Sequence, residues 1–158
     1  MNKLIIMCGI PGSGKSTYIK NHKAETDVVV SRDEIRFGML KDTDEYFANE
    51  NKVFTSFIEN IQFHLRHGQT VWADATHITK KSRAKVLNEV RELADEIEIV
   101  WIKTSLATAK AQNDLRTGRA KVPHAAIENM YHSFQAPVAQ EGFSNIIIVE
   151  KEEENINE

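Results

Sequence analysis

The sequence predicts a three-layer α/β/α domain built on a parallel five-stranded sheet. Two features of its 158 residues lead to this expectation. Short apolar runs, typical of buried strands, alternate along the chain with segments that carry helix caps and stops. No repeat, low-complexity linker or second domain interrupts the alternation. A chain that alternates strand and helix forms a parallel sheet with helices on both of its faces.

Five apolar runs are expected to form the strands. They are KLIIMC (3–8), DVVVS (27–31), QTVWAD (69–74), EIEIVWIK (96–103) and FSNIIIVE (143–150). The three consecutive valines of the second run are β-branched and apolar, which favours a strand over a helix. Parallel strands end at one edge of the sheet, and ligands of such folds bind beyond that edge.

Helical segments separate these runs. They are expected at 14–23, at 33–66 with a break near 41–45, at 76–94, at 105–118 and at 122–135. A threonine opens the third of these helices, and Ser105 caps the fourth. Gly118 is expected to stop the fourth helix, and Pro123 fits the first turn of the last.

Composition and charge limit the class of protein. Apolar residues make up 41% of the chain and charged residues 27%, which is ordinary for a globular domain. No apolar run approaches the ~20 residues that a membrane helix needs. A single cysteine excludes an internal disulfide. We expect a cytoplasmic protein with no membrane partner, one domain over 1–149 and a flexible acidic tail over 150–158. A homo-oligomer is compatible with the sequence.

The stretch CGIPGSGKST (8–17) matches the pattern G-x-x-x-x-G-K-[ST] between an expected strand and an expected helix. Its glycines let backbone N–H groups turn inward around phosphate oxygens, and the helix start adds positive potential. Lys15 would contact the outer phosphates, and Ser16 would offer a hydroxyl to Mg²⁺. The sequence therefore predicts a site for ATP with Mg²⁺. The residues expected to bind the nucleotide are Gly9, Gly12, Ser13, Gly14, Lys15, Ser16 and Thr17.

Two carboxylates follow the second and third expected strands. Asp33, in SRDEIR, is placed to accept a proton from an acceptor hydroxyl, and Arg36 would share its helix face. Asp74, in TVWADATH, is placed to support Mg²⁺ directly or through water. The reverse assignment of the two aspartates stays open. SRDE also fits a plain helix start with Ser31 as its cap.

Two arginines near a helix end are candidates for stabilising charge in a phosphoryl transition state. Arg116 and Arg119 flank Gly118 in DLRTGRAK, so a loop could fold them over the phosphates as a lid. The alternative is that they only complement the negative end of a helix.

With these motifs, the chain resembles the P-loop polynucleotide 5′-kinases, a family that includes the kinase domain of the T-even phage polynucleotide kinase–phosphatase and bacterial RNA-repair 5′-kinases. The likeness runs to about residue 149 and is most specific in VPHAAIENMYHSF. The resemblance implies a P-loop NTPase fold with an arginine-bearing lid. It implies that Asp33 is the general base and that Arg36 binds an acceptor phosphate. It also makes Thr76, in DATH, and Arg83 substrate-binding candidates.

The chain departs from the family pattern at two positions. His77 stands where asparagine is usual, and Gln112 replaces the first arginine of the lid segment QNDLRTGR. The segment DTDEYF is not preceded by a strand and lacks the threonine of a D-x-D-x-T phosphatase motif. We therefore expect kinase activity without 3′-phosphatase activity.

Three functions were weighed from these residues. The first is an ATP-dependent kinase that phosphorylates the 5′-hydroxyl of RNA or DNA. The second is a kinase of the same build that acts on a small-molecule or tRNA-linked hydroxyl, because the acceptor site decides the substrate. The third is a nucleotide-dependent switch. A guanine-selective switch usually carries N-K-x-D, and NKVF at Asn51 lacks the aspartate.

Overall fold

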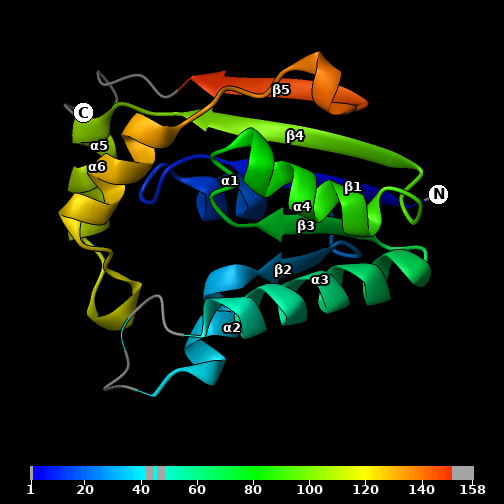
Figure 1. The fold of residues 1–158 in the computed structure, drawn as a ribbon, viewed down its shortest axis with the longest axis horizontal. Helices are drawn as coiled ribbons and strands as arrows, with labels where there is room; N and C mark the ends of the chain where they lie inside the picture. Colours follow the sequence, from blue (N-terminus) through cyan, green and yellow to red (C-terminus); the bar gives the residue numbers. More distant parts are fainter. Residues whose placement is uncertain (1, 42–44, 46–48, 151–158) are drawn as a thin grey trace.

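A single parallel sheet organises the chain. The computed structural model describes residues 2–41, 45 and 49–150. The strands are β1 (Lys3–Cys8), β2 (Val28–Ser31), β3 (Thr70–Asp74), β4 (Glu96–Lys103) and β5 (Asn145–Glu150). They lie in the order β2-β3-β1-β4-β5, and every neighbouring pair is parallel. All arrowheads in Figure 1 point to one edge of the sheet, so the loops after β1, β2 and β3 share that edge.

Helices cover both faces of the sheet and its carboxyl edge. They are α1 (Lys15–His22), α2 (Arg32–Met39), α3 (Glu50–Arg66), α4 (Lys80–Val90), α5 (Leu106–Asp114) and α6 (His124–Ser133). Two 3₁₀ turns, η1 (Gly118–Ala120) and η2 (Ala139–Glu141), lie in the connections. In Figure 1, α3 and α4 lie on the near face, α1 lies behind the sheet, and α5 and α6 stand at the carboxyl edge. The expected fold class is confirmed.

The central strand shows why the sheet requires long apolar runs. Leu4 and Ile6 lie in the core beneath α3 and α4, whereas Ile5 and Met7 lie in the core beneath α1. A strand buried on both faces needs apolar residues at consecutive positions rather than at alternate ones. β2 lies at the edge of the sheet, and its valines divide between the same two cores, with Val28 and Val30 on the side of α3 and Val29 on the side of α1.

Two helices are shorter than the sequence pattern suggested. The helix expected from 76 begins only at Lys80, because His77 has a left-handed φ of 46° that no helix accommodates. Thr79 then caps α4, and its hydroxyl accepts a hydrogen bond from the Ser82 amide at 3.0 Å. The helix expected to stop at Gly118 ends at Asp114. The side chain of Asn113 bonds the backbone of Val122 there and turns the chain back.

The remaining boundaries agree within a few residues. The break between α2 and α3 falls where it was expected, although 42–44 and 46–48 lie outside the described residues. β5 runs to Glu150, one residue beyond the expected domain end, and the tail expected beyond it lies outside the described residues. Within the described part of the chain, no helix has the length and apolar character needed to cross a bilayer.

Arg83, expected to bind substrate, is instead buried in an ion pair with Glu141. Its side chain is fully buried, and its guanidinium pairs with both carboxylate oxygens of Glu141 at 2.8 and 3.1 Å. It also donates to the carbonyl of His77 at 2.9 Å. Arg83 therefore ties α4 to η2 and to the loop after β3. The residues that line the pocket beside the phosphate-binding loop do not include Arg83, although the resemblance implied a substrate-binding role for it.

Removing the partner of this buried arginine should destabilise the fold. Glu141→Ala leaves the Arg83 charge uncompensated, so we expect a loss of about 3–5 kcal/mol in the free energy of unfolding, measured by urea denaturation. Glu150→Ala is the matched control, because its ion pair with Lys103 is largely exposed. The control should lose less than about 1 kcal/mol. Equal losses in the two variants would contradict the structural role of Arg83.

Candidate active site

The phosphate-binding loop is held between β3 and α5. The Gly9 amide donates to the carbonyl of Thr76 at 2.9 Å. Gly12 has a φ of +83°, and a Cβ at this position would lie 2.1 Å from the carbonyl oxygen of Ala109. Only glycine satisfies both the backbone angle and the close approach. Gly14, with a φ of 101°, then starts α1.

Lys15, Ser16 and Asp74 meet at the head of α1. The Lys15 ammonium donates to the carbonyls of Gly9 and Ile10 at 2.9 and 3.0 Å. The Ser16 hydroxyl donates to Oδ2 of Asp74 at 2.9 Å. Burial lowers the pKa of Lys15 and raises the pKa of Asp74, and the opposite charge of the other residue counters each shift.

The pair of Ser16 and Asp74 fits Mg²⁺. A hydroxyl and a carboxylate are oxygen ligands, and Mg²⁺ in kinase sites uses few protein ligands together with waters and phosphate oxygens. In the part of the chain that is described, no cluster of three or more His, Cys, Asp or Glu side chains could hold a metal alone. The other two loop side chains differ in exposure, with Ser13 buried and Thr17 exposed.

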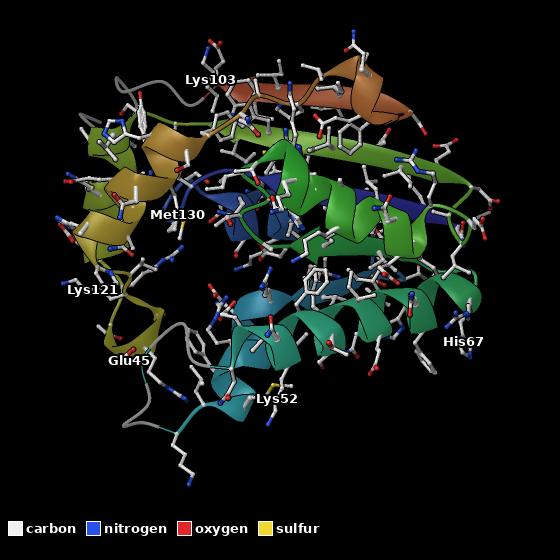
Figure 2. The ribbon with its side chains drawn as sticks, viewed as in Figure 1. Glu45, Lys52, His67, Lys103, Lys121 and Met130 are labelled. Carbon is white, nitrogen blue, oxygen red and sulfur yellow. The ribbon has the colours of Figure 1, made fainter. Side chains whose placement is uncertain are left out.

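A pocket of about 530 Å³ opens beside the phosphate-binding loop. Its walls come from that loop, α2, the start of α3, the loop after β3, the α5–α6 connection and α6, which includes Met130 (Figure 2). Most of the residues predicted for chemistry line this one pocket. They are Lys15, Ser16, Asp33, Arg36, Asp74, Thr76 and Arg116.

An ion-pair network forms the wall opposite the loop. Arg36 is buried, and its Nη1 donates to Oδ1 of Asp33. Its Nε and Nη2 donate to the two oxygens of Glu50 at 2.6 and 3.1 Å. Arg32 donates to the same carboxylate at 3.0 Å. Arg36 and Asp33 lie on the same face of α2, as expected, and Arg36 orients the Asp33 carboxylate. The Glu50 carboxylate pairs with both Arg32 and Arg36.

Glu50 belongs to this network, although no sequence motif predicts it. It is the first residue of α3 and stands 14 positions after Arg36, beyond the break between the helices. No local spacing marks it. The only indirect indication is the pair of arginines in α2. A buried guanidinium requires a carboxylate partner, and Asp33 alone does not satisfy both Arg32 and Arg36.

Arg32 also belongs to this wall, although it was not predicted. Burial lowers the pKa of its guanidinium, and the Glu50 carboxylate opposes that shift. Among the described residues, its buried Nε finds no hydrogen-bond partner. Arg32 lines the pocket, and its guanidinium lies 5.4 Å from the centre of the Phe54 ring.

Residues 115–121, within the connection between α5 and α6, are the segment that was expected to act as a lid. Its base is closed by Asn113, whose amide group donates to the Val122 carbonyl at 2.7 Å and accepts from the Val122 amide at 2.9 Å. Arg116 lines the pocket. Arg119 does not line it, because its Nη1 donates to the carbonyls of Phe37 and Leu40 at 3.1 and 2.7 Å. The structure thus brings one of the two expected lid arginines to the pocket.

Buried contacts of His77 and Cys8 join the loop after β3 to β1. His77 is buried, and its Nδ1 lies 2.6 Å from the Met7 carbonyl. Burial lowers the pKa of His77 to about 4. The Cys8 thiol donates to the His77 carbonyl at 3.2 Å, and burial raises its pKa to about 11. Both side chains are therefore neutral at pH 7 and fix the loop after β3.

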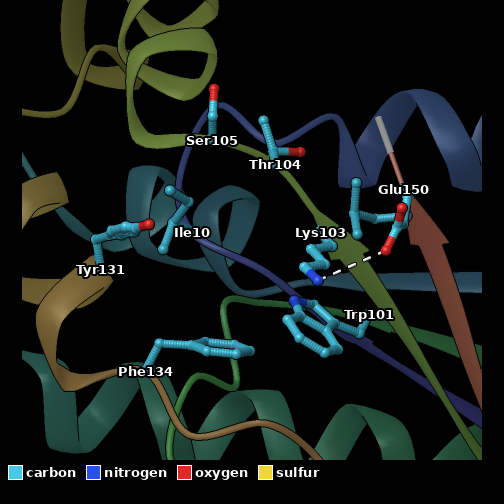
Figure 3. A pocket seen from close by; sticks show the side chains of 9 residues that line it. Ile10, Trp101, Lys103, Thr104, Ser105, Tyr131, Phe134 and Glu150 are labelled. Carbon is cyan, nitrogen blue, oxygen red and sulfur yellow. Dashed lines mark ion pairs between the residues drawn. The ribbon is translucent and has the colours of Figure 1, made fainter. Parts of the chain in front are cut away.

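A second cavity of about 500 Å³ lies between α6 and the ends of β4 and β5 (Figure 3). Its aromatic lining consists of Trp101, Tyr131 and Phe134, and the ion-paired side chains of Lys103 and Glu150 also line it. None of the residues predicted for chemistry lines this cavity. The pocket beside the phosphate-binding loop is therefore the candidate active site.

A family comparison agrees with this geometry. The profile of the family AAA_33, described as "AAA domain", matches residues 4–137. The chain belongs to this family. It is a P-loop kinase domain by its family match and fold, and its kinase-family relatives support a phosphotransferase.

The chain is similar to individual proteins over most of its own length. The L-seryl-tRNA(Sec) kinase of Methanococcus maripaludis is 27% identical over 142 residues, which are 85% of this chain and 53% of that protein. The bifunctional polynucleotide phosphatase/kinase of Schizosaccharomyces pombe is 24% identical over 147 residues, 91% of this chain and 32% of that protein. A chain in the Pnkp1/Rnl/Hen1 RNA repair complex superposes with a TM-score of 0.73 at 26% identity, covering 84% of this chain and 43% of that chain.

The chain spans about half or less of the length of these relatives. The resemblance to polynucleotide kinases stated from the motifs is confirmed, and a nucleotide-binding P-loop is supported. Kinases of this family act with ATP and a divalent metal in general.

The buried His77 should make stability depend on pH. With a pKa near 4 in the folded chain against 6.5 in the unfolded chain, only the unfolded chain takes up the proton between these values. This contribution to stability is present above pH 6.5 and is lost as pH falls toward 4. From pH 7 to pH 5 the wild type should lose about 2 kcal/mol more than His77→Asn, as measured by urea unfolding. Asparagine suits the left-handed backbone at this position. Parallel pH profiles for the two proteins would contradict a neutral, buried imidazole.

Proposed function

We propose that this protein transfers the γ-phosphoryl group of ATP to the 5′-hydroxyl of a polynucleotide, RNA or DNA. One observation carries the proposal: the Asp33 carboxylate lines the same pocket as Lys15, Ser16 and Asp74. A kinase needs a carboxylate opposite the terminal phosphate to accept the proton of the acceptor hydroxyl. The Asp33 carboxylate and the phosphate-binding loop line one pocket of about 530 Å³.

The transfer step follows from these roles. The acceptor oxygen bonds to the γ-phosphorus while the bond from that phosphorus to the β–γ bridging oxygen breaks, so ADP leaves. The hydroxyl proton passes to the Asp33 carboxylate, which Arg36 holds by an ion pair. Lys15 and Arg116 stabilise negative charge on the transferred group.

Mg²⁺, when bound, neutralises charge on the β- and γ-phosphates. Ser16 and Asp74 would hold it, since their oxygens are already within 2.9 Å of each other. The backbone amides of Gly12, Gly14 and Thr17 would bind the phosphates. The amides of Gly9 and Ser13 donate to the carbonyls of Thr76 and Ile10, so these two residues would shape the cradle. Arg32, Arg36 and Thr76 would face the acceptor strand.

The relatives support a nucleic-acid acceptor and suggest one competitor. A polynucleotide phosphatase/kinase and an RNA repair complex point to a 5′-hydroxyl end. The seryl-tRNA(Sec) kinase points instead to the hydroxyl of a tRNA-linked serine. We propose one kinase domain over 1–149, without 3′-phosphatase activity, acting in the cytoplasm. A homo-oligomer is compatible with this function.

An acceptor screen tests the proposal. Labelled ATP and Mg²⁺ would be incubated with 5′-hydroxyl RNA, 5′-hydroxyl DNA, seryl-tRNA and small-molecule alcohols. We expect transfer to the 5′-hydroxyl strands, weakening as salt rises because phosphate contacts release counterions. Transfer to seryl-tRNA alone would replace the proposal with its competitor. Phosphate release without transfer to any acceptor would favour a nucleotide switch.

Asp33 offers the sharpest single test of the mechanism. Asp33→Asn keeps the shape of the side chain but removes the proton acceptor, so kcat should fall roughly 100- to 10,000-fold. The Kd for ATP, measured by calorimetry, should stay within about twofold because the phosphate contacts are unchanged. Glu59→Gln, an exposed carboxylate outside the pocket, is the control. An active Asp33→Asn enzyme would reassign the general base.

A further inference from the structure

Arg119 bridges the lid and the far side of the pocket. Its guanidinium donates to the carbonyls of Phe37 and Leu40 at 3.1 and 2.7 Å and lies 5.3 Å from the centre of the Phe37 ring. These carbonyls lie at the C-terminal end of α2, where the helix dipole favours a cation. In Figure 1 the connection between α5 and α6 reaches across the carboxyl edge toward α2.

The two elements joined by Arg119 carry opposite halves of the site. α2 bears Asp33 and Arg36 on the acceptor side. The lid bears Arg116 and Ala120, which line the pocket from the other side. A contact that fixes the lid against α2 therefore fixes the charge-stabilising arginine relative to the general base.

Two contacts fix the lid to the rest of the chain. At its base, the buried Asn113 side chain both donates to and accepts from the Val122 backbone. Near its tip, Arg119 bonds the end of α2, after a turn at Gly118 with a φ of +61°. Arg116 lies in the sequence between Asn113 and Arg119, and its Nη1 donates within the lid to the Ala120 carbonyl at 3.4 Å.

We propose that Arg119 is a positioning residue, a latch that couples closure of the lid to α2. The latch sets Arg116 across the pocket from Asp33, and it gives Arg119 a role other than direct contact with the phosphates. The proposal rests on the proposed function for its effect on transfer. The latch contact itself can be tested without an acceptor.

Hydrogen exchange of the free protein tests the latch directly. In Arg119→Ala, amides of the lid and of the last turn of α2 should both exchange about tenfold faster, the factor expected for losing hydrogen bonds from a charged donor. Lys121→Ala is the matched control, because it removes one positive charge from the same exposed loop. α2 amides that exchange at the wild-type rate in Arg119→Ala would overturn the proposal.

Kinetics separate a latch from a phosphate ligand. Arg119→Ala should lower kcat/KM for the 5′-hydroxyl acceptor about tenfold and leave the ATP Kd within about twofold, and Arg119→Lys should recover part of the loss. A comparable loss of ATP affinity, with unchanged exchange in the lid, would instead make Arg119 a phosphate contact and overturn the latch. If the wild type transfers phosphate to no acceptor, the proposed function fails and the exchange measurement alone decides the latch.

A double-mutant cycle with Phe37→Leu completes the test. Phe37 supplies the ring over which the Arg119 guanidinium lies. The effects of Arg119→Ala and Phe37→Leu on exchange in the lid should be less than additive, because each removes part of the same contact. Strict additivity would overturn the proposal even where one variant alone perturbs the fold.

Discussion

The approach of the phosphate-binding loop to α5 is the constraint on which the site depends. Gly12 lies against the carbonyl of Ala109 with no room for a side chain, and the Thr104 hydroxyl donates to the Ser13 carbonyl at 3.2 Å. The Gly9 amide fixes the other side of the loop to the segment after β3. These contacts place the head of α1 beside Asp74. Because α5 leads directly into the lid, the same helix contacts the phosphate-binding loop and carries the lid.

The acceptor side depends on a different kind of interaction. Two arginines and two carboxylates, Arg32, Arg36, Asp33 and Glu50, form a half-buried chain of ion pairs. Such a network is costly to break because removing one member leaves a desolvated charge. In the proposed kinase it would also orient the Asp33 carboxylate before any substrate arrives, which is the kind of preorganisation that electrostatic catalysis uses. The donor side is thus shaped by backbone packing and the acceptor side by paired charges.

Local motifs predicted the donor half of the site and the position of Asp33. The loop from Gly9 to Ser16 has a fixed spacing, and Asp33 and Asp74 follow strands whose ends must share one edge. The residues that were missed or misplaced depend on contacts between distant parts of the chain. Arg83 pairs with Glu141 at a separation of 58 residues, and Arg119 bonds the Leu40 carbonyl at a separation of 79. The early end of α5 has a more local origin, since the side chain of Asn113 bonds the backbone of Val122 at a separation of 9 residues.

The reciprocal pairing of Asn113 with Val122 has a consequence for how this scaffold can change. The amide group of the Asn113 side chain donates to the Val122 carbonyl and accepts from the Val122 N–H, as a neighbouring backbone strand would. This pairing fixes the distance between the chain segments on either side of the lid. Lengthening a loop whose ends are already fixed costs little free energy, because closure entropy grows only slowly with length. Segments of different size and composition could therefore be exchanged between these two residues without moving α5 or α6. Such an exchange would have to keep an arginine at the place of Arg116, because the proposed transfer step uses its charge at the pocket.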